Sequence, residues 1–333
     1  MQLTALRIYQ ESGAAKHAVK AVLESMPVES LTAGDVLIRV QYSSINYKDA
    51  LAATGAGKIL RRYPLNGGVD LAGVVVESTD ATYKAGQAVL VTGCGLSETL
   101  DGGYAEYARV PTSAVIPMPS GLDALAVMTL GTAGFTAALA IHRMEQNGLQ
   151  PDQGEVAITG ATGGVGSVAI DMLSARGYQV CAITGKESER GYLQQLGAKQ
   201  IVLRSELQLG QAALESTRFA GAIDNLGGEW LSWLVRSTQL MGSVASIGMA
   251  AGSQLQTSVM PFILRGVNVL GITSSNTPRA LREQVWQRIA TDLKPAHLDL
   301  IRTRIVELAE LPTVFKDYLQ GQTRGRTVVR IQQ

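Results

Sequence analysis

EVAITGATGGVGSVAIDML, residues 155–173, joins an apolar run to a cluster of glycines and then to a second run rich in small and apolar residues. In the dinucleotide-binding pattern G-x-G-x-x-G, the first glycine makes a tight turn. The second lets the backbone approach a pyrophosphate, and the third lets a helix pack closely on a strand. The frame here is Ala161-x-Gly163-x-x-Gly166, so the two glycines with the strictest steric roles are present. The stretch therefore predicts a strand, a phosphate-binding turn and a helix whose N-terminus faces an anion.

The residues after Gly154 place this turn at the start of a series of alternating strands and helices. Such alternation predicts βαβ units with right-handed crossovers and a parallel, doubly wound sheet. A flexible glycine turn without a ligand is the alternative interpretation, and the position of the turn in the series favours nucleotide binding. The predicted strands are 155–159, 178–184, 199–204, 219–227, 242–248 and 267–273, and the predicted helices are 165–176, 188–197, 229–240 and 279–293.

The first part of the chain has a different pattern, with short β-branched runs bounded by glycine and proline. Strands are predicted within 35–45, 68–78, 86–95 and 102–119, which is typical of an antiparallel, barrel-like unit. Residues 123–146 are rich in alanine and leucine and predict one helix, and GRTVVRI (325–331) predicts a terminal strand that rejoins the first unit. We therefore expect a β-rich domain formed by 1–125 and 297–333, with an α/β domain, 126–296, inserted into it.

The bulk composition limits the partners and the compartment. The 333 residues carry a formal net charge of +1, which gives no field that would attract nucleic acid or an anionic membrane. The N-terminal residues lack the pattern of a secretory signal, and no apolar run is expected to be long enough to span a bilayer. With two cysteines only, a reducing cytoplasm is the simpler location. We expect a cytoplasmic protein whose partner is a small molecule.

The end of the second predicted strand of the α/β domain selects the nucleotide. An NAD site usually has Asp or Glu there for the ribose hydroxyl, whereas this chain has Thr184, Gly185 and Lys186. A missing carboxylate and an adjacent cation favour the extra phosphate of NADPH, which Arg204 is also placed to reach. Arg190 is a weaker candidate. The alternative is that these cations are ordinary solvated surface charges.

The candidates for the chemistry are few. His17, His142 and His297 are far apart, and two cysteines cannot form a four-cysteine zinc site, so no metal is expected. SSINYKDAL (43–51) follows a predicted strand and contains Tyr47, whose phenol can donate a hydrogen bond or proton to a developing oxyanion. An unremarkable polar loop is the alternative.

Several motifs in order across nearly the whole chain resemble one family. They are SSINYKDALAATGAGKI, GVDLAGVV, GGYAEYARV, LGTAGFTAALAI, TGATGGVGSVAIDML, VMPFILRGVNVLGI and GRTVV. Together they resemble the zinc-free quinone oxidoreductase branch of the medium-chain dehydrogenase/reductase superfamily, and within it the acrylyl-CoA reductase group.

The resemblance implies an α/β fold with a GroES-like β-rich catalytic domain and a Rossmann domain, with a cleft between them. Zinc-dependent relatives use a cysteine and a GHE motif where this chain has Asn46 and GVD (68–70), which agrees with a metal-free protein. The resemblance also implies a homodimer formed through the sheet edge at 267–273.

The resemblance further implies the site residues. Tyr47 would lie beside the nicotinamide, as the catalytic and a cofactor-binding residue. The other positions that match cofactor contacts are Thr162, Gly163, Gly164, Val165, Thr184, Gly185, Lys186, Arg204, Ile247, Ile272 and Ser274.

The implied reaction is NADPH-dependent reduction of the C=C bond of a small 2-enoyl-CoA, acrylyl-CoA to propanoyl-CoA. The alternatives are an NADPH:quinone oxidoreductase and a non-catalytic NADPH-binding regulator. Lys48, Lys58, Arg61 and Arg62 flank the Tyr47 loop, where they either attract CoA phosphates or form a solvated surface.

Overall fold

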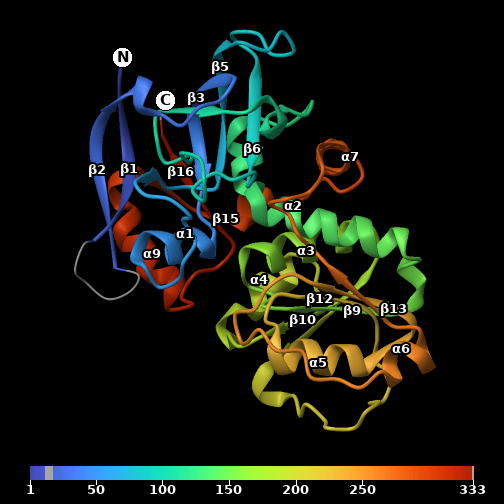
Figure 1. Cartoon of the computed structure of the whole chain (residues 1–333). Coiled ribbons are helices and arrows are strands. Elements are labelled where there is room, and N and C mark those ends of the chain that lie inside the picture. Colours follow the sequence, from blue (N-terminus) through green and yellow to red (C-terminus); the bar gives the residue numbers. More distant parts are fainter. Residues whose placement is uncertain (12–17, 332–333) are drawn as a thin grey trace. The chain divides into compact units, whose positions relative to one another are not determined.

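The computed structural model describes residues 1–11 and 18–331, so His17 lies outside the described residues. The chain divides into two compact units. The first unit comprises residues 1–132, 275–283 and 298–333, and the second comprises residues 133–274 and 284–297. Each unit has its own sheets and is described by itself (Figure 1).

The second unit contains a six-stranded sheet in the order β11-β10-β9-β12-β13-β14, and every strand pairs in parallel with its neighbours. Its strands are β9 (Glu155–Thr159), β10 (Gln179–Thr184), β11 (Gln200–Leu203), β12 (Phe219–Asp224), β13 (Thr238–Ser246) and β14 (Asn268–Gly271). The chain runs outward from β9 to β11 and then returns to the other side of β9 with β12. This reversal is the doubly wound topology expected from the sequence, and it creates a switch point between β9 and β12.

Helices cover both faces of this sheet, with α3 on one side and α5 on the other (Figure 1). Helices of the second unit are α3 (Gly164–Ala175), α4 (Arg190–Gln195), α5 (Gly228–Ser237) and α6 (Met260–Arg265). Helix α7 (Arg279–Ala290) begins among residues of the first unit and ends among residues of the second. Helix α5 buries Trp230 and Trp233 against the sheet, and the Trp233 ring meets the Phe219 ring edge-on at 5.7 Å between centroids. This packing holds the amino end of β12 against helix α5.

The first unit is built on two sheets. One has the order β2-β1-β4, and the other has the order β15-β16-β3-β5-β6-β8, with β7 also paired to β3. Their strands are β1 (Gln2–Gln10), β2 (Val19–Pro27), β3 (Val36–Ser44), β4 (Leu65–Asn66), β5 (Asp70–Ser78), β6 (Ala88–Thr92), β7 (Tyr107–Val110), β8 (Ile116–Pro117), β15 (Arg302–Glu307) and β16 (Arg326–Arg330). The predicted return of the terminal strand is confirmed, because β16 pairs antiparallel with β3.

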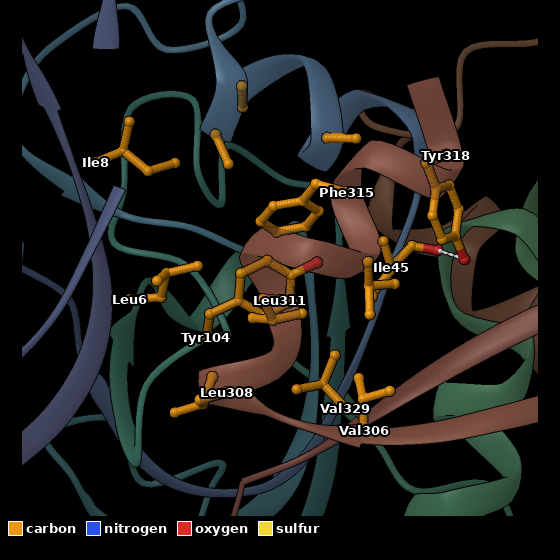
Figure 2. Close-up of a cluster of buried hydrophobic side chains, with 14 of the residues drawn as sticks. Leu6, Ile8, Ile45, Tyr104, Val306, Leu308, Leu311, Phe315, Tyr318 and Val329 are labelled. Carbon is orange, nitrogen blue, oxygen red and sulfur yellow. Dashed lines mark hydrogen bonds between the residues drawn. The ribbon is translucent and has the colours of Figure 1, made fainter. Parts of the chain in front are cut away.

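A hydrophobic cluster in the first unit joins the β1 strand, helix α1 (Tyr47–Thr54) and helix α9 (Leu311–Leu319) (Figure 2). The rings of Tyr104 and Phe315 lie 6.1 Å apart in this cluster. Tyr318 donates its hydroxyl to the Ile45 carbonyl at 3.3 Å, which Figure 2 shows as a dashed line. The chain just before Tyr47 is thereby fixed to the core. The short helix α8 (Leu298–Ile301) precedes β15.

Helix α2 (Ala124–Gln146) corrects two expectations. Gly131 interrupts it with φ 52° and ψ −155°, a conformation that L side chains avoid, so the predicted single helix is kinked. The expectation that no apolar run is long enough to span a bilayer is wrong for this helix by length and composition. In the structure, however, 78% of its apolar window is buried inside the protein, as in a core helix.

Two other boundaries differ from the sequence prediction. The helix predicted over 229–240 ends at Ser237, and Thr238 begins β13. Residues 275–283 pack with the first unit, although they fall within the range predicted for the α/β domain. Hydrogen bonds hold this segment to the first unit. Arg279 donates to the Thr112 carbonyl at 2.7 Å, and Arg282 donates to the Ser113 carbonyl at 3.0 Å.

Candidate active site

The glycine turn of the second unit connects β9 to α3 at the carboxyl edge of the sheet. Gly160 has φ +60° and starts the turn, and Gly163 is the N-cap of α3. An added Cβ at Gly166 would lie 2.5 Å from the Gly160 carbonyl oxygen and 2.8 Å from the Ala161 Cα. Gly166 is therefore needed for the close packing of helix on turn that the sequence pattern predicts.

Gly163 differs from Gly166, because the space that a Cβ at Gly163 would occupy is largely open. A Cβ there would lie 3.3 Å from the Gly160 oxygen, and no other non-neighbouring atom would lie within 4 Å. The first N–H groups of α3, at Gly164, Val165 and Gly166, have no partner within the helix, as at every α-helix N-terminus. An open glycine beside free N–H groups and the positive end of a helix dipole suits a pyrophosphate. The turn therefore fits a dinucleotide.

The switch point between β9 and β12 carries a polar network that the sequence analysis missed. The buried Asp224 carboxylate accepts a hydrogen bond from the Thr159 hydroxyl at 2.6 Å and from the Gly227 N–H at 2.8 Å. Asn225 donates its side-chain amide to the Thr159 carbonyl at 2.7 Å. Burial raises the pKa of Asp224. The network fixes the carboxyl ends of both strands beside the glycine turn, and the polar pair that ends the apolar run FAGAIDN was the available signal.

The end of β10 and the start of the next turn bring two predicted residues into contact. The Arg204 guanidinium lies over Gly185, where an added Cβ would be 2.8 Å from Nε. Thr184 is buried and accepts a hydrogen bond from the Lys186 N–H at 3.0 Å, which shapes the turn. Thr184, Gly185, Lys186 and Arg204 therefore form one basic group at the carboxyl edge of β10 and β11.

Arg204 and Arg190 have different surroundings, although the sequence offered both as candidates. Arg190 donates to the Ile201 carbonyl at 3.0 Å and to the Glu206 carboxylate at 3.1 Å. Within residues 1–11 and 18–331, the exposed Arg204 side chain has neither a hydrogen bond nor an ion pair. Arg204 is thus available for an anionic ligand, whereas the charge of Arg190 is already compensated.

Ile247, Ile272 and Ser274 lie at the same edge of the sheet. Ile247 follows β13 and donates its N–H to the Asp224 carbonyl at 2.9 Å. Ile272 follows β14 and donates its N–H to the Ser246 carbonyl at 3.1 Å. All three side chains are half-buried. Together with the glycine turn, the residues predicted from the second unit therefore lie along one edge, at the carboxyl ends of the strands.

Tyr47 is the first residue of α1 in the first unit, with half of its surface exposed. The preceding Asn46 is the N-cap, and its N–H donates to the Asp49 carboxylate at 2.8 Å. The Asn46 side-chain amide donates to the buried Asp70 at 2.7 Å and to Asp49 at 3.3 Å. In the described part of the chain, the Tyr47 hydroxyl has no hydrogen-bond partner. The backbone of Tyr47 is therefore fixed, while its phenol is available to a substrate.

Asp70 and Arg326 form a buried network behind Asn46. Asp70 accepts hydrogen bonds from the Ser44 hydroxyl at 2.6 Å and from the Thr132 N–H at 2.9 Å. Arg326 donates to the Ser44 hydroxyl at 2.8 Å and to the Ile45 carbonyl at 2.9 Å. Burial strengthens such charged hydrogen bonds and makes an unpaired member costly.

The kink at Gly131 makes room for this network. A Cβ there would lie 2.6 Å from Asp70 Oδ2 and 2.7 Å from Arg326 Nη2. Sequence reasoning missed Asp70 and Arg326 as parts of the site. GVD and GRTVV were noted only as motifs, and nothing local indicates that their charged side chains meet inside the first unit.

Asp49 is the second buried carboxylate at this turn. It accepts the Val69 N–H at 3.0 Å in addition to the donors from Asn46. Burial and the nearby Asp70 charge raise the pKa of Asp49 to about 7. The group at the base of the Tyr47 turn therefore titrates near neutral pH.

No cluster of three or more His, Cys, Asp or Glu side chains that could hold a metal is present within residues 1–11 and 18–331. Cys94 and Cys181 are both free thiols.

A Rossmann unit with an open glycine turn, combined with a GroES-like unit, defines a dehydrogenase or reductase. Residues 32–120 match the family described as alcohol dehydrogenase GroES-like domain, and residues 164–291 match the family described as zinc-binding dehydrogenase. The putative quinone oxidoreductase YhfP of Bacillus subtilis is 45% identical, covering 97% of this chain and 99% of that protein. The acrylyl-CoA reductase AcuI of Ruegeria pomeroyi is 43% identical, covering 97% of this chain and 96% of that protein.

Solved structures agree with these relationships. The yhdH oxidoreductase of Salmonella enterica, in complex with NADP, is 43% identical with a TM-score of 0.94 and full coverage of both chains. YhfP, solved with NAD bound, is 43% identical with a TM-score of 0.95 and 99% coverage of both chains. The chain belongs to the medium-chain dehydrogenase/reductase superfamily, in the quinone oxidoreductase branch that contains the acrylyl-CoA reductases.

Proposed function

We propose that this chain is an NADPH-dependent reductase of the activated C=C bond of a small 2-enoyl-CoA, and that it converts acrylyl-CoA to propanoyl-CoA. The observation that carries the proposal is the 43% identity to an acrylyl-CoA reductase over nearly the full length of both chains. NADPH supplies the hydride when bound, and a proton completes the saturated product.

The second unit would hold the dinucleotide. The N–H groups of Gly164 and Val165 would bind the pyrophosphate, beside Thr162 and the open face of Gly163. Lys186 and Arg204 would bind the additional phosphate across Gly185 and Thr184. Ile247, Ile272 and Ser274 would lie toward the nicotinamide. NAD in the YhfP structure makes the choice between the two nucleotides a separate question, which the relative kcat/KM for NADPH and NADH decides.

Tyr47 would act on the substrate. Reduction at the β-carbon places negative charge on the thioester oxygen, and the Tyr47 hydroxyl would donate a hydrogen bond to that oxygen or a proton to the α-carbon. Backbone N–H groups or a water are the other possible donors. Replacing Tyr47 by Phe should lower kcat about 100-fold without changing the Tm, because the phenol is exposed and has no partner in the described chain. Unchanged turnover would remove Tyr47 from this role.

In this proposal, residues 1–125 and 297–333 act as the catalytic domain, and residues 126–296 act as the NADPH-binding domain. The enzyme would work in the cytoplasm as a homodimer. The edge strand β14 and exposed apolar side chains of the second unit, including Met241, Ile263 and Leu264, support a self-association surface. Sedimentation equilibrium of the wild type and of an Ile263→Asp variant tests it, because a dimer should dissociate in the variant.

Quinone reduction is the second candidate function, because the relative with 45% identity is a putative quinone oxidoreductase. Parallel kcat/KM measurements with acrylyl-CoA, longer enoyl-CoAs and simple quinones distinguish the two. High activity on acrylyl-CoA is expected. Inert acrylyl-CoA with active quinones would refute the proposed substrate, and tight NADPH binding without turnover of any acceptor would indicate a regulator.

A further inference from the structure

The first unit has an open pocket of about 390 Å³ beside the turn that carries Tyr47. Lys58, Ile59, Leu60, Arg61 and Glu98 line it. The pocket lies within one unit, and its lining includes two of the four cations that the sequence places near Tyr47.

The backbone of this pocket is anchored to the core. Leu60 is only 1% exposed and belongs to the cluster drawn in Figure 2, and Ile59 packs against the same cluster. The Arg61 N–H donates to the Glu98 carbonyl at 2.8 Å, which joins the two walls. Lys58 and Arg61 therefore project as exposed side chains from a backbone segment that is fixed to the core.

The charges of the pocket do not cancel. Glu98 is its one acidic lining residue, and the Glu98 carboxylate pairs with Lys48 at 3.2 Å. In the structure of residues 1–11 and 18–331, the side chains of Lys58 and Arg61 have neither an ion pair nor a hydrogen bond. Two uncompensated cations on the wall of a concave site attract a polyanion.

Lys48 connects this pocket to the site of chemistry. It follows Tyr47 in α1 and also donates to the Ser275 hydroxyl at 3.1 Å. Coenzyme A has its thioester at one end of a long neutral arm and its phosphates at the other end. The Lys48–Glu98 ion pair joins the wall of the cationic pocket to the Tyr47 turn, so both ends of such a substrate would meet the first unit.

We infer that this pocket binds the phosphate groups of coenzyme A through Lys58 and Arg61. The inference rests on the proposed function, since it names the residues that would bind the CoA portion of the same acyl-CoA substrate. Arg62 is also exposed and adjacent, but it does not line the pocket, and so it provides a matched control.

The test is the Kd of free CoA, measured by titration calorimetry on enzyme saturated with NADP⁺ so that CoA cannot enter the dinucleotide site. Lys58→Gln and Arg61→Gln should each raise the Kd about five-fold, and the double variant should raise it about 20-fold. Glu98→Gln should lower the Kd, because it removes the carboxylate from the wall. Dephospho-CoA distinguishes the 3′-phosphate from the diphosphate, and pantetheine, which has no phosphate, should respond to none of the substitutions.

A wild-type enzyme that does not bind CoA, or a double variant whose Kd changes less than about two-fold, would overturn the inference. An equal effect of Arg62→Gln would also overturn it, since the effect would then reflect general surface charge. The Kd is measured without turnover, so failure of the proposed reaction appears separately, as inert acrylyl-CoA with intact CoA binding.

Discussion

The guanidinium group of Arg204 lies directly over Gly185, so that any side chain at residue 185 would collide with it. Gly185 thus gives Arg204 its position at the end of β10. We predict that Gly185→Ala displaces the guanidinium and raises the KM for NADPH about five-fold, with little change for NADH. Steady-state kinetics with both nucleotides measures the effect. An equal loss with NADH would mean that the substitution disturbs the turn as a whole.

Arg204→Gln tests the cation itself. Because the side chain is exposed and has no partner in the described chain, its loss should leave the Tm unchanged and raise the KM for NADPH about ten-fold. Arg190→Gln is the matched control, since Arg190 already binds Glu206 and the Ile201 carbonyl. A preference for NADPH that survives Arg204→Gln would contradict the phosphate role.

Gly166→Ala should destabilise the protein by about 2 kcal/mol, because the new methyl would lie 2.5 Å from the Gly160 oxygen in a rigid turn. Nucleotide affinity should fall with it. Gly191 in α4 is the control: no atom would lie within 4 Å of a Cβ there, so Gly191→Ala should stabilise by up to about 1 kcal/mol. Differential scanning calorimetry of the two variants should give Tm shifts of opposite sign.

Asp70→Asn should cost about 3 kcal/mol, because it replaces one of two acceptor oxygens by a donor and leaves the buried Arg326 cation without a compensating charge. Adding Arg326→Met should recover part of the stability but not the activity, since the network that holds Asn46 beside Tyr47 would still be incomplete. Unfolding and turnover of both single variants and of the double variant form the cycle. Activity that recovers together with stability would show that the network does not orient Tyr47.

Asp49 should make stability depend on pH. Burial and Asp70 raise its pKa from 3.8 to about 7, so the folded protein keeps this proton to higher pH than the unfolded chain. The stabilisation from Asp49 is therefore complete below about pH 4 and is lost as the pH rises to about 7. Relative to an Asp49→Asn variant, the wild type should lose stability between about pH 4 and about pH 7. A Tm difference that is constant with pH would disprove the raised pKa.

The sequence predicts the second unit better than the first. The order of strands, the turn at 159–167 and the grouping of Lys186 with Arg204 follow from local patterns, because βαβ units repeat one short-range rule. The helix over 229–240 was predicted too long because Thr238–Leu240 continues its apolar pattern, although these residues begin β13. The place of these residues in the parallel sheet, and not their local apolar pattern, decides their conformation.

The first unit depends on contacts that are distant in the sequence. Gly131 stands inside a continuous apolar run and gives no sign of a kink, which arises because Asp70 and Arg326 occupy the space beside it. Asp49 follows a predicted strand and Asp70 lies within one, and both look like ordinary polar residues, yet both are buried. Tyr47 could be proposed from the resemblance, but the network that fixes its backbone could not.

The link between Arg326 and the Ile45 carbonyl spans 281 positions, and this has a consequence for biosynthesis. The segment before Tyr47 leaves the ribosome early, but the guanidinium that satisfies it arrives only after the entire nucleotide-binding unit has been translated. Nascent chains can therefore complete the parallel sheet while the Tyr47 turn is still immature. We expect a chain that ends before β16 to lack the Arg326 donor to the Ile45 carbonyl, even where its parallel sheet is complete.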